Sequence, residues 1–226
     1  MKKKSINKNN KRVIAVIPAY NESQHIEGVV KQTLNHVNQV IVVDDCSSDN
    51  TAQLARSAGA IVLSHPINLQ KGASLKTGCE FAIKNNADII VMLDADGQHD
   101  PNEIPKIIEP LNKVDFVFGC RELNKNMPLT KKAGNNFLSR LSKLLYKKHI
   151  SDTQSGFRAF NTKIYDKIKW NSSDYGVETE IIRNLAKNDI EHEEVKISTI
   201  YNDNYKGTTP IDGMKIAFNM VKGSFS

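Results

Sequence analysis

Residues 89–99 read IIVMLDADGQH, an apolar run that ends abruptly in two aspartates, Asp94 and Asp96. An uninterrupted apolar run of this length is typical of a strand that is covered on both faces of a sheet. Alternate side chains of an extended chain point to the same face, so the two carboxylates can approach one hard cation. The competing interpretation is a solvated acidic loop after a strand, which is the more common origin of an isolated D-x-D pair. The surrounding sequence has to decide between the two.

Two earlier segments repeat this apolar pattern. Val13 to Ile17, which is closed by Pro18, and Gln39 to Val43 are rich in Val and Ile without alternation. Such segments predict parallel central strands, and Ala60 to Ser64 is a further short strand.

Helical patterns separate these strands. Asp100-Pro101-Asn102-Glu103 combines an N-cap acid, a proline at the first helical position and a glutamate at the third, which predicts a helix start. Strands that alternate with helices predict an α/β fold with a doubly wound, mostly parallel sheet, whose ligands bind at the carboxyl ends of the strands. The expected helices are Ile26 to Leu34, Thr51 to Ala58, Gly72 to Lys84 and about Pro101 to Leu111, and Asp115 to Gly119 is the next strand.

The alternation of strands and helices changes after Cys120. We expect a long basic helix from about Thr130 to Lys148 and an amphipathic helix from Ile211 to Lys222, whose apolar face suits core packing and membrane contact equally. The other expected elements are an extended segment from Gly156 to Phe160, a helix from about Val177 to Lys187 and a strand through Val195, Ile197 and Thr199.

The composition is that of a globular protein. The chain has 226 residues and a formal net charge of +6, its mean hydropathy is −0.43, and no apolar run approaches the roughly 18 residues that a membrane helix needs. Residues 1–12 are expected to form a disordered cationic arm, with contact to an anionic membrane as the alternative. We expect no nucleic acid partner, because the basic residues are not interleaved with aromatic ones. Cys46, Cys79 and Cys120 lack a C-x-x-C pair, so we expect reduced thiols in a cytoplasmic protein.

Three polar segments follow the ends of expected strands, and each alone is a weak signal. They are PAYNE at 18–22, DDCSSDNT at 44–51 and DADGQH at 94–99. Together, in this order, they resemble the family-2 inverting glycosyltransferases of the GT-A fold. The later segments NLQKGA at 68–73, GCR at 119–121 and DTQSGFR at 152–158 are similar to the polyprenyl-phosphate sugar transferases of the dolichyl-phosphate mannosyltransferase type. The resemblance covers roughly residues 13 to 201.

The resemblance implies one GT-A domain over residues 13–226. Residues 13–120 would form its nucleotide-sugar-binding half and residues 121–226 its acceptor and lid half. Glu22 would accept a hydrogen bond from a hydroxyl group of the nucleoside. Val43 and Asp45 would contact the edge of the base, and Asp44 would be structural instead. The implied donor-binding residues are Pro18, Tyr20, Glu22, Val43, Asp45, Lys71, Asp94, Ala95, Asp96 and Gln98.

The resemblance also implies a cofactor, Mg²⁺ or Mn²⁺, bound by Asp96 and Gln98. Asp94 would lie on the nucleotide side, near the ribose or just outside the metal ligands. The chemistry agrees independently, because Mg²⁺ takes only one or two carboxylates together with phosphate oxygens, and the cation neutralises charge on the leaving diphosphate. For His99, a helix-capping or core role and an active-site role both stay open.

Local structural interpretations compete with binding at the first two segments. Ser23 can cap the helix that follows the first segment, and Asp49 can cap the helix that begins at Thr51. Capping does not exclude ligand binding by the same loops.

Positively charged residues of the second half would hold the acceptor phosphate. Arg121, directly after a strand, is favoured because an arginine fork suits phosphate, and together with Asp96 it is expected to be catalytic. One or two of Lys131, Lys132, Ser155 and Arg158 are expected to be structural. The implied acceptor-binding residues are Arg121, Lys131, Lys132, Ser155, Arg158 and Lys206.

The nature of this acceptor determines the mechanism that we expect. A sugar hydroxyl would need a general base within hydrogen-bond reach, whereas a lipid monophosphate is already an anionic nucleophile near neutral pH. Orientation and electrostatics then suffice. We therefore expect a metal-dependent inverting transfer of mannose or glucose, with GDP-mannose favoured over UDP-glucose, that gives a β-linked polyprenyl or dolichyl phosphate sugar.

The acceptor also implies a location. The protein would be peripheral on the cytoplasmic face of the membrane, reached directly or through a membrane-protein partner.

Three departures from the family pattern keep the donor open. Gln70 stands where glycine is usual, the segment from Gly176 to Glu180 lacks the basic residue of mannosyl enzymes, and the motif after Tyr201 retains only Lys206. Glu178 would face sugar hydroxyls or would serve as a first-turn acid of a helix.

Other functions explain less of the sequence. A transferase with a hydroxyl acceptor and an inactive nucleotide-binding relative are the closest alternatives. A haloacid-dehalogenase-like phosphatase needs D-x-D-x-T near the first strand, and a receiver-like module built on Asp44 and Asp45 leaves Asp96 and Gln98 unexplained.

Overall fold

Seven strands form one sheet in the order β3-β2-β1-β4-β6-β5-β7. The computed structural model describes residues 11–121, 129–148, 150–174, 176–198, 200, 217–218 and 220–221. Neighbouring strands are parallel except at β6, which runs antiparallel to both β4 and β5. The expected α/β fold with a mostly parallel sheet is confirmed. The strands are β1 Val13–Ala19, β2 Gln39–Asp44, β3 Ile61–Ser64, β4 Ile89–Met92, β5 Phe116–Arg121, β6 Arg158–Asn161 and β7 His192–Ile197.

Helices cover both faces of the sheet, and two separate hydrophobic clusters lie between the layers. Residues of α1, α2 and α4 pack in one cluster, and residues of α3, α6 and α7 pack in the other. Alternate residues of the central strands enter opposite clusters, as the pleat requires. The helices are α1 Ile26–Thr33, α2 Thr51–Ser57, α3 Gln70–Lys84, α4 Ile104–Ile108, α5 Leu129–Tyr146, α6 Tyr165–Ile168 and α7 Val177–Lys187, with 3-10 turns η1 Pro101–Glu103, η2 Glu109–Asn112 and η3 Thr162–Ile164.

The segment expected to be one helix from Pro101 to Leu111 is broken into η1, α4 and η2. Its start is as expected, because Asp100 Oδ1 accepts the N–H of Asn102 at 2.9 Å and a proline follows the cap. Pro105 and Pro110 then each remove a backbone donor, which prevents one continuous helix.

The single antiparallel strand, β6, was not expected from the sequence. The expected extended segment began at Gly156, whereas β6 begins at Arg158 and inserts between β4 and β5. Because it runs against its neighbours, its first residues lie at the carboxyl ends of the parallel strands. The chain of the second half therefore returns to the edge where the polar motifs end.

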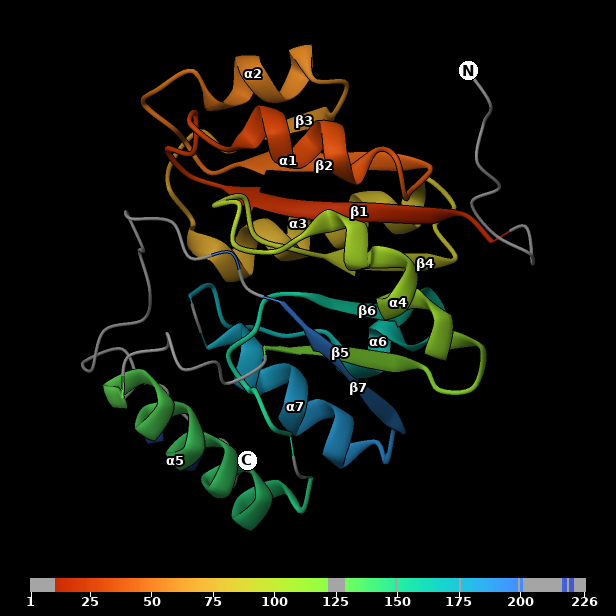
Figure 1. Cartoon of the computed structure of the whole chain (residues 1–226), viewed down its shortest axis with the longest axis vertical. Helices are drawn as coiled ribbons and strands as arrows, with labels where there is room; N and C mark the ends of the chain where they lie inside the picture. Colours follow the sequence, from red (N-terminus) through yellow and green to blue (C-terminus); the bar gives the residue numbers. More distant parts are fainter. Residues whose placement is uncertain are drawn as a thin grey trace.

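Helix α5 lies at one end of the molecule and β3 with α2 at the other (Figure 1). The C-terminal segment packs on α5 through Met220, which contacts Leu138, and Tyr146 Oη donates to the carbonyl of Met220 at 3.0 Å. Of the helix expected over 211–222, the structure describes residues 217, 218, 220 and 221, all helical. No helix among the described residues is long and apolar enough to cross a bilayer.

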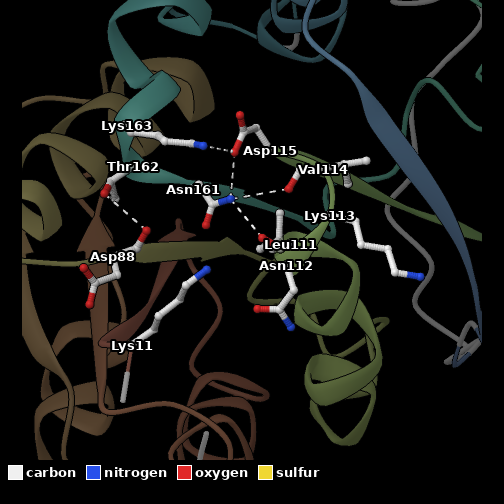
Figure 2. Close-up of a pocket in the computed structure, with 10 residues that line it drawn as sticks. All are labelled: Lys11, Asp88, Leu111, Asn112, Lys113, Val114, Asp115, Asn161, Thr162 and Lys163. Atoms are coloured by element: carbon white, nitrogen blue, oxygen red, sulfur yellow. Dashed lines mark hydrogen bonds and ion pairs between the residues drawn. The ribbon is translucent and has the colours of Figure 1, made fainter. Parts of the chain in front are cut away.

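A cavity of about 370 Å³ opens at the amino ends of β4 and β5, opposite the polar motifs (Figure 2). Asn161 Nδ2 donates to the carbonyl of Leu111 at 3.0 Å and to Asp115 Oδ1 at 2.9 Å. The ammonium of Lys163 lies 2.8 Å from the same Asp115 oxygen. These polar groups satisfy one another, and this cavity is not the candidate donor site.

Candidate active site

The polar segments that follow β1, β2 and β4 meet at one edge of the sheet. The three strands are neighbours and parallel, so their carboxyl ends lie side by side. This is the edge at which open α/β sheets bind ligands.

The loops after β1 and β2 are joined by hydrogen bonds before any ligand is present. Asn21 N donates to Ser47 Oγ at 2.9 Å, and Ser48 N donates back to Asn21 Oδ1 at 2.8 Å. Glu22 N donates to Thr51 Oγ1 at 2.8 Å. The loops therefore form a preorganised wall.

Two expected donor residues lie on this wall. Tyr20 is 49% exposed, and Glu22 is half-buried. Both are placed where a ligand at the strand ends could reach them.

Neither residue expected to cap a helix is its N-cap residue, since α1 begins after His25 and α2 after Asn50. Ser23 does not cap α1, whose N-cap residue is His25 without a side-chain hydrogen bond, so that interpretation is wrong. Ser23 N instead donates to Asp49 Oδ2 at 3.1 Å. The other oxygen of Asp49 accepts the N–H of Thr51 at 3.0 Å, at the first residue of α2.

Asp45 anchors the start of α3. Its buried carboxylate contacts His65 Nδ1 at 2.7 Å and accepts the N–H groups of Leu69 and Gln70 at 2.9 and 2.7 Å. These bonds hold Gln70 at a φ of 72°. The Asp45 carboxylate is thus directed at this turn and not at the open edge where a base would bind.

Val43 also points away from the expected base site. Its side chain is 0% exposed and lies beneath Gly78 of α3, where an added Cβ would come within 3.1 Å of it. Only the backbone of Val43 is left to contact a base.

Two other expected donor residues lie at the ends of strands. Pro18, at the end of β1, is half-buried, and Ala95, after β4, is buried.

Lys71 lies between two carboxylates from different parts of the chain. Its Nζ is 2.7 Å from Asp94 Oδ1 and 3.0 Å from Glu178 Oε1. Although burial opposes the charged form, the two carboxylates raise the pKa of Lys71 above its ordinary value. The same burial would raise the pKa of Asp94, but Lys71 and then His99 lower it to about 2. Lys71 and Asp94 are therefore both ionised at neutral pH, and Lys71 is not a surface lysine.

A packing contact brings Glu178 to Lys71. The start of α3 lies against the segment before α7, where Trp170 Nε1 donates to the carbonyl of Gly72 at 2.8 Å and Ala73 N donates to the carbonyl of Ser173 at 3.1 Å. Glu178 is in the first turn of α7. Its Oε2 atom is buried and has no hydrogen-bond partner in the part of the chain that the structure describes.

Asp96 and Gln98 form a tight turn after β4. Gln98 N donates to Asp96 Oδ1 at 3.0 Å, and Gly97 between them adopts a φ of 73°, which suits glycine. Burial and then the nearby charge of Asp94 raise the pKa of Asp96 to about 6. The edge therefore concentrates negative charge that a cation would compensate.

These oxygen donors fit a hard divalent cation. No group of three or more His, Cys, Asp or Glu side chains suited to a metal occurs among the described residues. Mg²⁺ does not require one, because it combines one or two carboxylates with phosphate oxygens and water. The Asp96 carboxylate and the Gln98 amide, with Asp94 behind them, form a donor set of that kind.

His99 is a buried neutral residue that holds the acidic loop. Its ring is 5% exposed, packs 5.3 Å from the ring of Phe157, and accepts the N–H of Asp94 at Nδ1 at 3.3 Å. Burial, which outweighs the attraction of Asp94, lowers the pKa of His99 to about 4. Of the roles left open by the sequence, the structure supports the core one.

Gly156 lies directly against the Asp94 carboxylate. A Cβ at this position would come within 2.4 Å of Asp94 Oδ2 and 2.7 Å of Oδ1. Only glycine allows the chain to pass so close, and this contact exists because β6 begins at this edge.

Arg121, the last residue of β5, is oriented by Asp152. Its Nε and Nη2 atoms lie 2.6 and 3.0 Å from the two oxygens of Asp152, which is 2% exposed. Burial opposes ionisation of Asp152, but Arg121 keeps its pKa below the usual range. Arg121 also contributes to the low pKa of Asp94, so the two groups belong to one site.

Comparison with known proteins identifies the family. Residues 14–169 match the family described as Glycosyl transferase family 2. The chain is a family-2 glycosyltransferase. This confirms the resemblance found in the sequence and shows that the protein is an enzyme.

Relatives and solved structures agree with this. A UDP-N-acetylglucosamine–dolichyl-phosphate N-acetylglucosaminyltransferase of Methanococcus voltae is 34% identical to this glycosyltransferase, over 94% of this chain and 96% of the relative. A polyprenol monophosphomannose synthase of Mycolicibacterium smegmatis is 24% identical, over 93% and 85%. Glucosyl-3-phosphoglycerate synthase of Mycobacterium tuberculosis, solved with Mn²⁺, uridine diphosphate and glucosyl-3-phosphoglycerate, has a TM-score of 0.74 at 20% identity, covering 96% of this chain and 80% of that one. The last likeness concerns the fold alone.

Two residues expected at the acceptor lie in the core of this glycosyltransferase. Arg158 is 1% exposed, and its guanidinium donates to the carbonyls of Ser155, Thr153 and Glu178 at 2.9 to 3.1 Å. Ser155 is also 1% exposed, and its Oγ accepts the N–H of Phe157 at 3.4 Å. Arg158 and Ser155 are therefore structural residues, a role that was expected for one or two of the four acceptor candidates Lys131, Lys132, Ser155 and Arg158. Lys206 and the side chains of Lys131 and Lys132 lie outside the described residues.

Sequence reasoning missed the partners that position the charged groups. Asp152 and Gly156 belong to the DTQSGFR segment, in which only the arginine and serine were assigned roles. An acid at the start of this motif, and a glycine within it, are the signals that could have indicated them.

Proposed function

We propose that this glycosyltransferase moves a sugar from a nucleoside-diphosphate sugar to a polyprenyl or dolichyl phosphate. The observation that carries the proposal is the orientation of Arg121 by Asp152 at the sheet edge where Asp94 also lies, with the charge of Arg121 contributing to the low pKa of Asp94. A fixed arginine next to the acidic loop suits an acceptor that brings its own negative charge. The 34% identical relative, which is named for transfer to dolichyl phosphate, supports the same acceptor class.

Two residues that could serve as a general base for a hydroxyl acceptor are already engaged within the protein. His99 accepts a backbone N–H and is buried, and Glu178 is paired with Lys71. A lipid phosphate needs no base, since orientation against the anomeric carbon and electrostatic stabilisation suffice. The transfer proceeds with inversion in a single displacement and gives a β-linked product.

Asp96 and Gln98 would hold Mg²⁺ or Mn²⁺, with Asp94 behind them. When bound, the cation would act as a Lewis acid that neutralises the charge of the departing diphosphate. Lys71 keeps Asp94 ionised and in place, and Gly156 provides the space that this carboxylate occupies.

Glu178 is the residue that we assign to the sugar. Its Oε1 faces Lys71, and its Oε2 has no partner among the described residues. This carboxylate can accept a hydrogen bond from a sugar hydroxyl or from the N–H of an acetamido group. The sequence favoured GDP-mannose, whereas the relative named above favours UDP-N-acetylglucosamine as the first donor to test.

A donor screen tests the proposal. The full chain is incubated with a short polyprenyl phosphate, Mg²⁺ or Mn²⁺, and radiolabelled UDP-N-acetylglucosamine, GDP-mannose or UDP-glucose. We expect labelled lipid with one donor, none after chelation of the metal, and none with Asp96→Asn. Absence of labelled lipid with all donors would contradict the proposal, and metal-dependent nucleotide binding without turnover would favour an inactive relative.

A conservative variant tests the sugar contact. Glu178→Gln should lower the rate with the preferred donor and change the ratio between donors, while binding of the free nucleoside diphosphate is unchanged. An equal loss with every donor would contradict the assignment of Glu178 to the sugar.

A further inference from the structure

Helix α5 exposes two large apolar side chains on its outer face. Phe137 is 58% exposed and Leu144 is 78% exposed. They are seven residues apart, close to two helical turns, so they lie above one another on the same face. Leu138 and Ser142, on the opposite face, are buried against the protein. Phe137 and Leu144 thus point away from the core and take no part in its packing.

Cations surround this apolar pair. Arg140 lies three residues after Phe137 and four before Leu144, which places it on the same face, and Lys143 and Lys147 are exposed beside it. The sequence from 129 to 148 contains six basic residues and no acidic one. The basic residues are Lys131, Lys132, Arg140, Lys143, Lys147 and Lys148.

The C-terminal segment adds a further exposed ring. Ala217 and Met220 pack on α5, whereas Phe218 is 69% exposed. Because Met220 contacts Leu138, this segment covers the face of α5 opposite to Phe137 and Leu144, and those two side chains stay exposed.

We propose that the outer face of α5, which carries Phe137 and Leu144, docks on the surface of an anionic lipid bilayer. An amphipathic helix with apolar side chains amid basic ones lies in the membrane interface, where the rings and aliphatic groups enter the headgroup boundary and the cations meet acidic lipids. A second copy of the chain is a poorer occupant, because the exposed cations Arg140, Lys143 and Lys147 would face one another across a symmetric contact.

Hydrogen bonds link α5 to the segment that holds Arg121. Asn135 of α5 donates to the carbonyl of Ser151 at 3.0 Å, and the next residue, Asp152, holds Arg121. A bilayer that contacts α5 is therefore close to the arginine assigned to the acceptor phosphate. The inference rests on the proposed function for this role, since a polyprenyl phosphate is a membrane lipid.

Vesicle flotation of the full chain tests the apolar part. The vesicles contain phosphatidylcholine alone or phosphatidylcholine mixed with phosphatidylglycerol, without acceptor lipid or donor. We expect binding to the anionic vesicles, and a loss of about tenfold or more for the double variant Phe137→Ser with Leu144→Ser. Ile67→Ser, which removes a side chain that is 62% exposed elsewhere, is the matched control and should bind like the wild type. Equal binding by the double variant and the control would overturn the proposal.

The charged part is tested in the same assay. Lys143→Gln with Lys147→Gln should weaken binding to anionic vesicles by about fivefold for each cation removed. Lys84→Gln with Lys113→Gln removes the same charge from exposed positions elsewhere and should have a much smaller effect. Equal losses in the two pairs would show non-specific attraction and would overturn the assignment to α5. A dimer in light scattering that disappears in the Phe137 and Leu144 variant would instead indicate a second copy as the occupant.

The outcomes separate this inference from the proposed function. Transfer to a short polyprenyl phosphate in detergent should be unchanged in the α5 variants, because none of these residues lies in the site. If the wild type binds vesicles through α5 but transfers no sugar, the docking surface is supported and the proposed function is refuted. If the wild type transfers sugar in detergent but does not bind vesicles, the proposed function is supported and the docking surface is refuted.

Discussion

The Nζ atom of Lys71 lies 2.7 Å from Oδ1 of Asp94, and both side chains are largely buried. The lysine comes from the start of α3 and the aspartate from the loop after β4. The contact keeps the carboxylate charged and fixed in a site that would otherwise favour its protonation. The predictions below concern the residues that maintain this arrangement.

Replacement of Lys71 should destabilise the protein. Lys71→Met leaves Asp94 and Glu178 as neighbouring buried carboxylates without their cation, which should lower the free energy of unfolding by about 3 kcal/mol. Urea denaturation at neutral pH measures this. Lys84→Met, at an exposed position of the same helix, is the control, and similar stability of the two variants would show that the ion pair contributes little.

A methyl group at Gly156 should disturb Asp94 while leaving the fold intact. The added Cβ of Gly156→Ala would come within 2.4 Å of the carboxylate, and such crowding costs about 1 to 3 kcal/mol. Because the carboxylate must move, we expect donor binding to weaken by about tenfold. Calorimetry with the nucleotide and Mg²⁺ measures the affinity. Gly134→Ala has open space around the new Cβ and should bind normally, and normal binding by both variants would refute the role of Gly156.

Replacement of Arg121 should impair use of the acceptor more than binding of the donor nucleotide. Arg121→Lys keeps the charge but loses the two-pronged geometry, so kcat/KM for the polyprenyl phosphate should fall by about 100-fold with nucleotide binding unchanged. Asp152→Asn should give a smaller loss of the same kind, because it weakens the orientation of Arg121. Arg56→Lys, at an exposed position of α2, is the control. A parallel loss of nucleotide affinity would place Arg121 at the donor instead.

His99 should make stability depend on pH. Its pKa is about 4 in the folded protein against 6.5 for an ordinary histidine. Above pH 6.5 neither state is protonated, whereas between pH 6.5 and 4 only the unfolded state takes up the proton. The contribution of His99 to stability should therefore fall with decreasing pH in this window, by up to about 1.4 kcal/mol per pH unit, and the raised pKa of Asp96 acts in the opposite direction.

Denaturation curves across that window test the prediction. His99→Asn should show a shallower decline than the wild type. An unchanged slope in His99→Asn would show that protonation of other groups determines the decline.

The sequence predicted the strand ends and their polar loops because both depend on local patterns. Val13–Ala19 and Ile89–Met92 were recognisable from apolar runs, and the turn at Asp96 follows from its neighbours. Contacts between distant residues were not predictable in this way. Glu178 lies beside Lys71 only because α7 and α3 pack on the same face of the sheet.

Buried polar partners explain the other differences. Arginine is usually an exposed cation, but the guanidinium of Arg158 lies in the core and donates hydrogen bonds to three backbone carbonyl groups. Asp45 was expected to face the ligand, yet the backbone of residues 69 and 70 and His65 satisfy it. One sequence shows which residues are charged, but it does not show which of them meet a partner within the protein.

The antiparallel strand β6 has a consequence for chimaeric enzymes. It belongs to the second half of the chain, but it completes the sheet between β4 and β5, and the residues just before it place Gly156 against Asp94. A graft that exchanged residues 121–226 with those of a relative would replace an inner strand of the sheet together with the acceptor region. A chimaera meant to change acceptor preference should therefore keep β6 with its own sheet, and should not join two halves at residue 121.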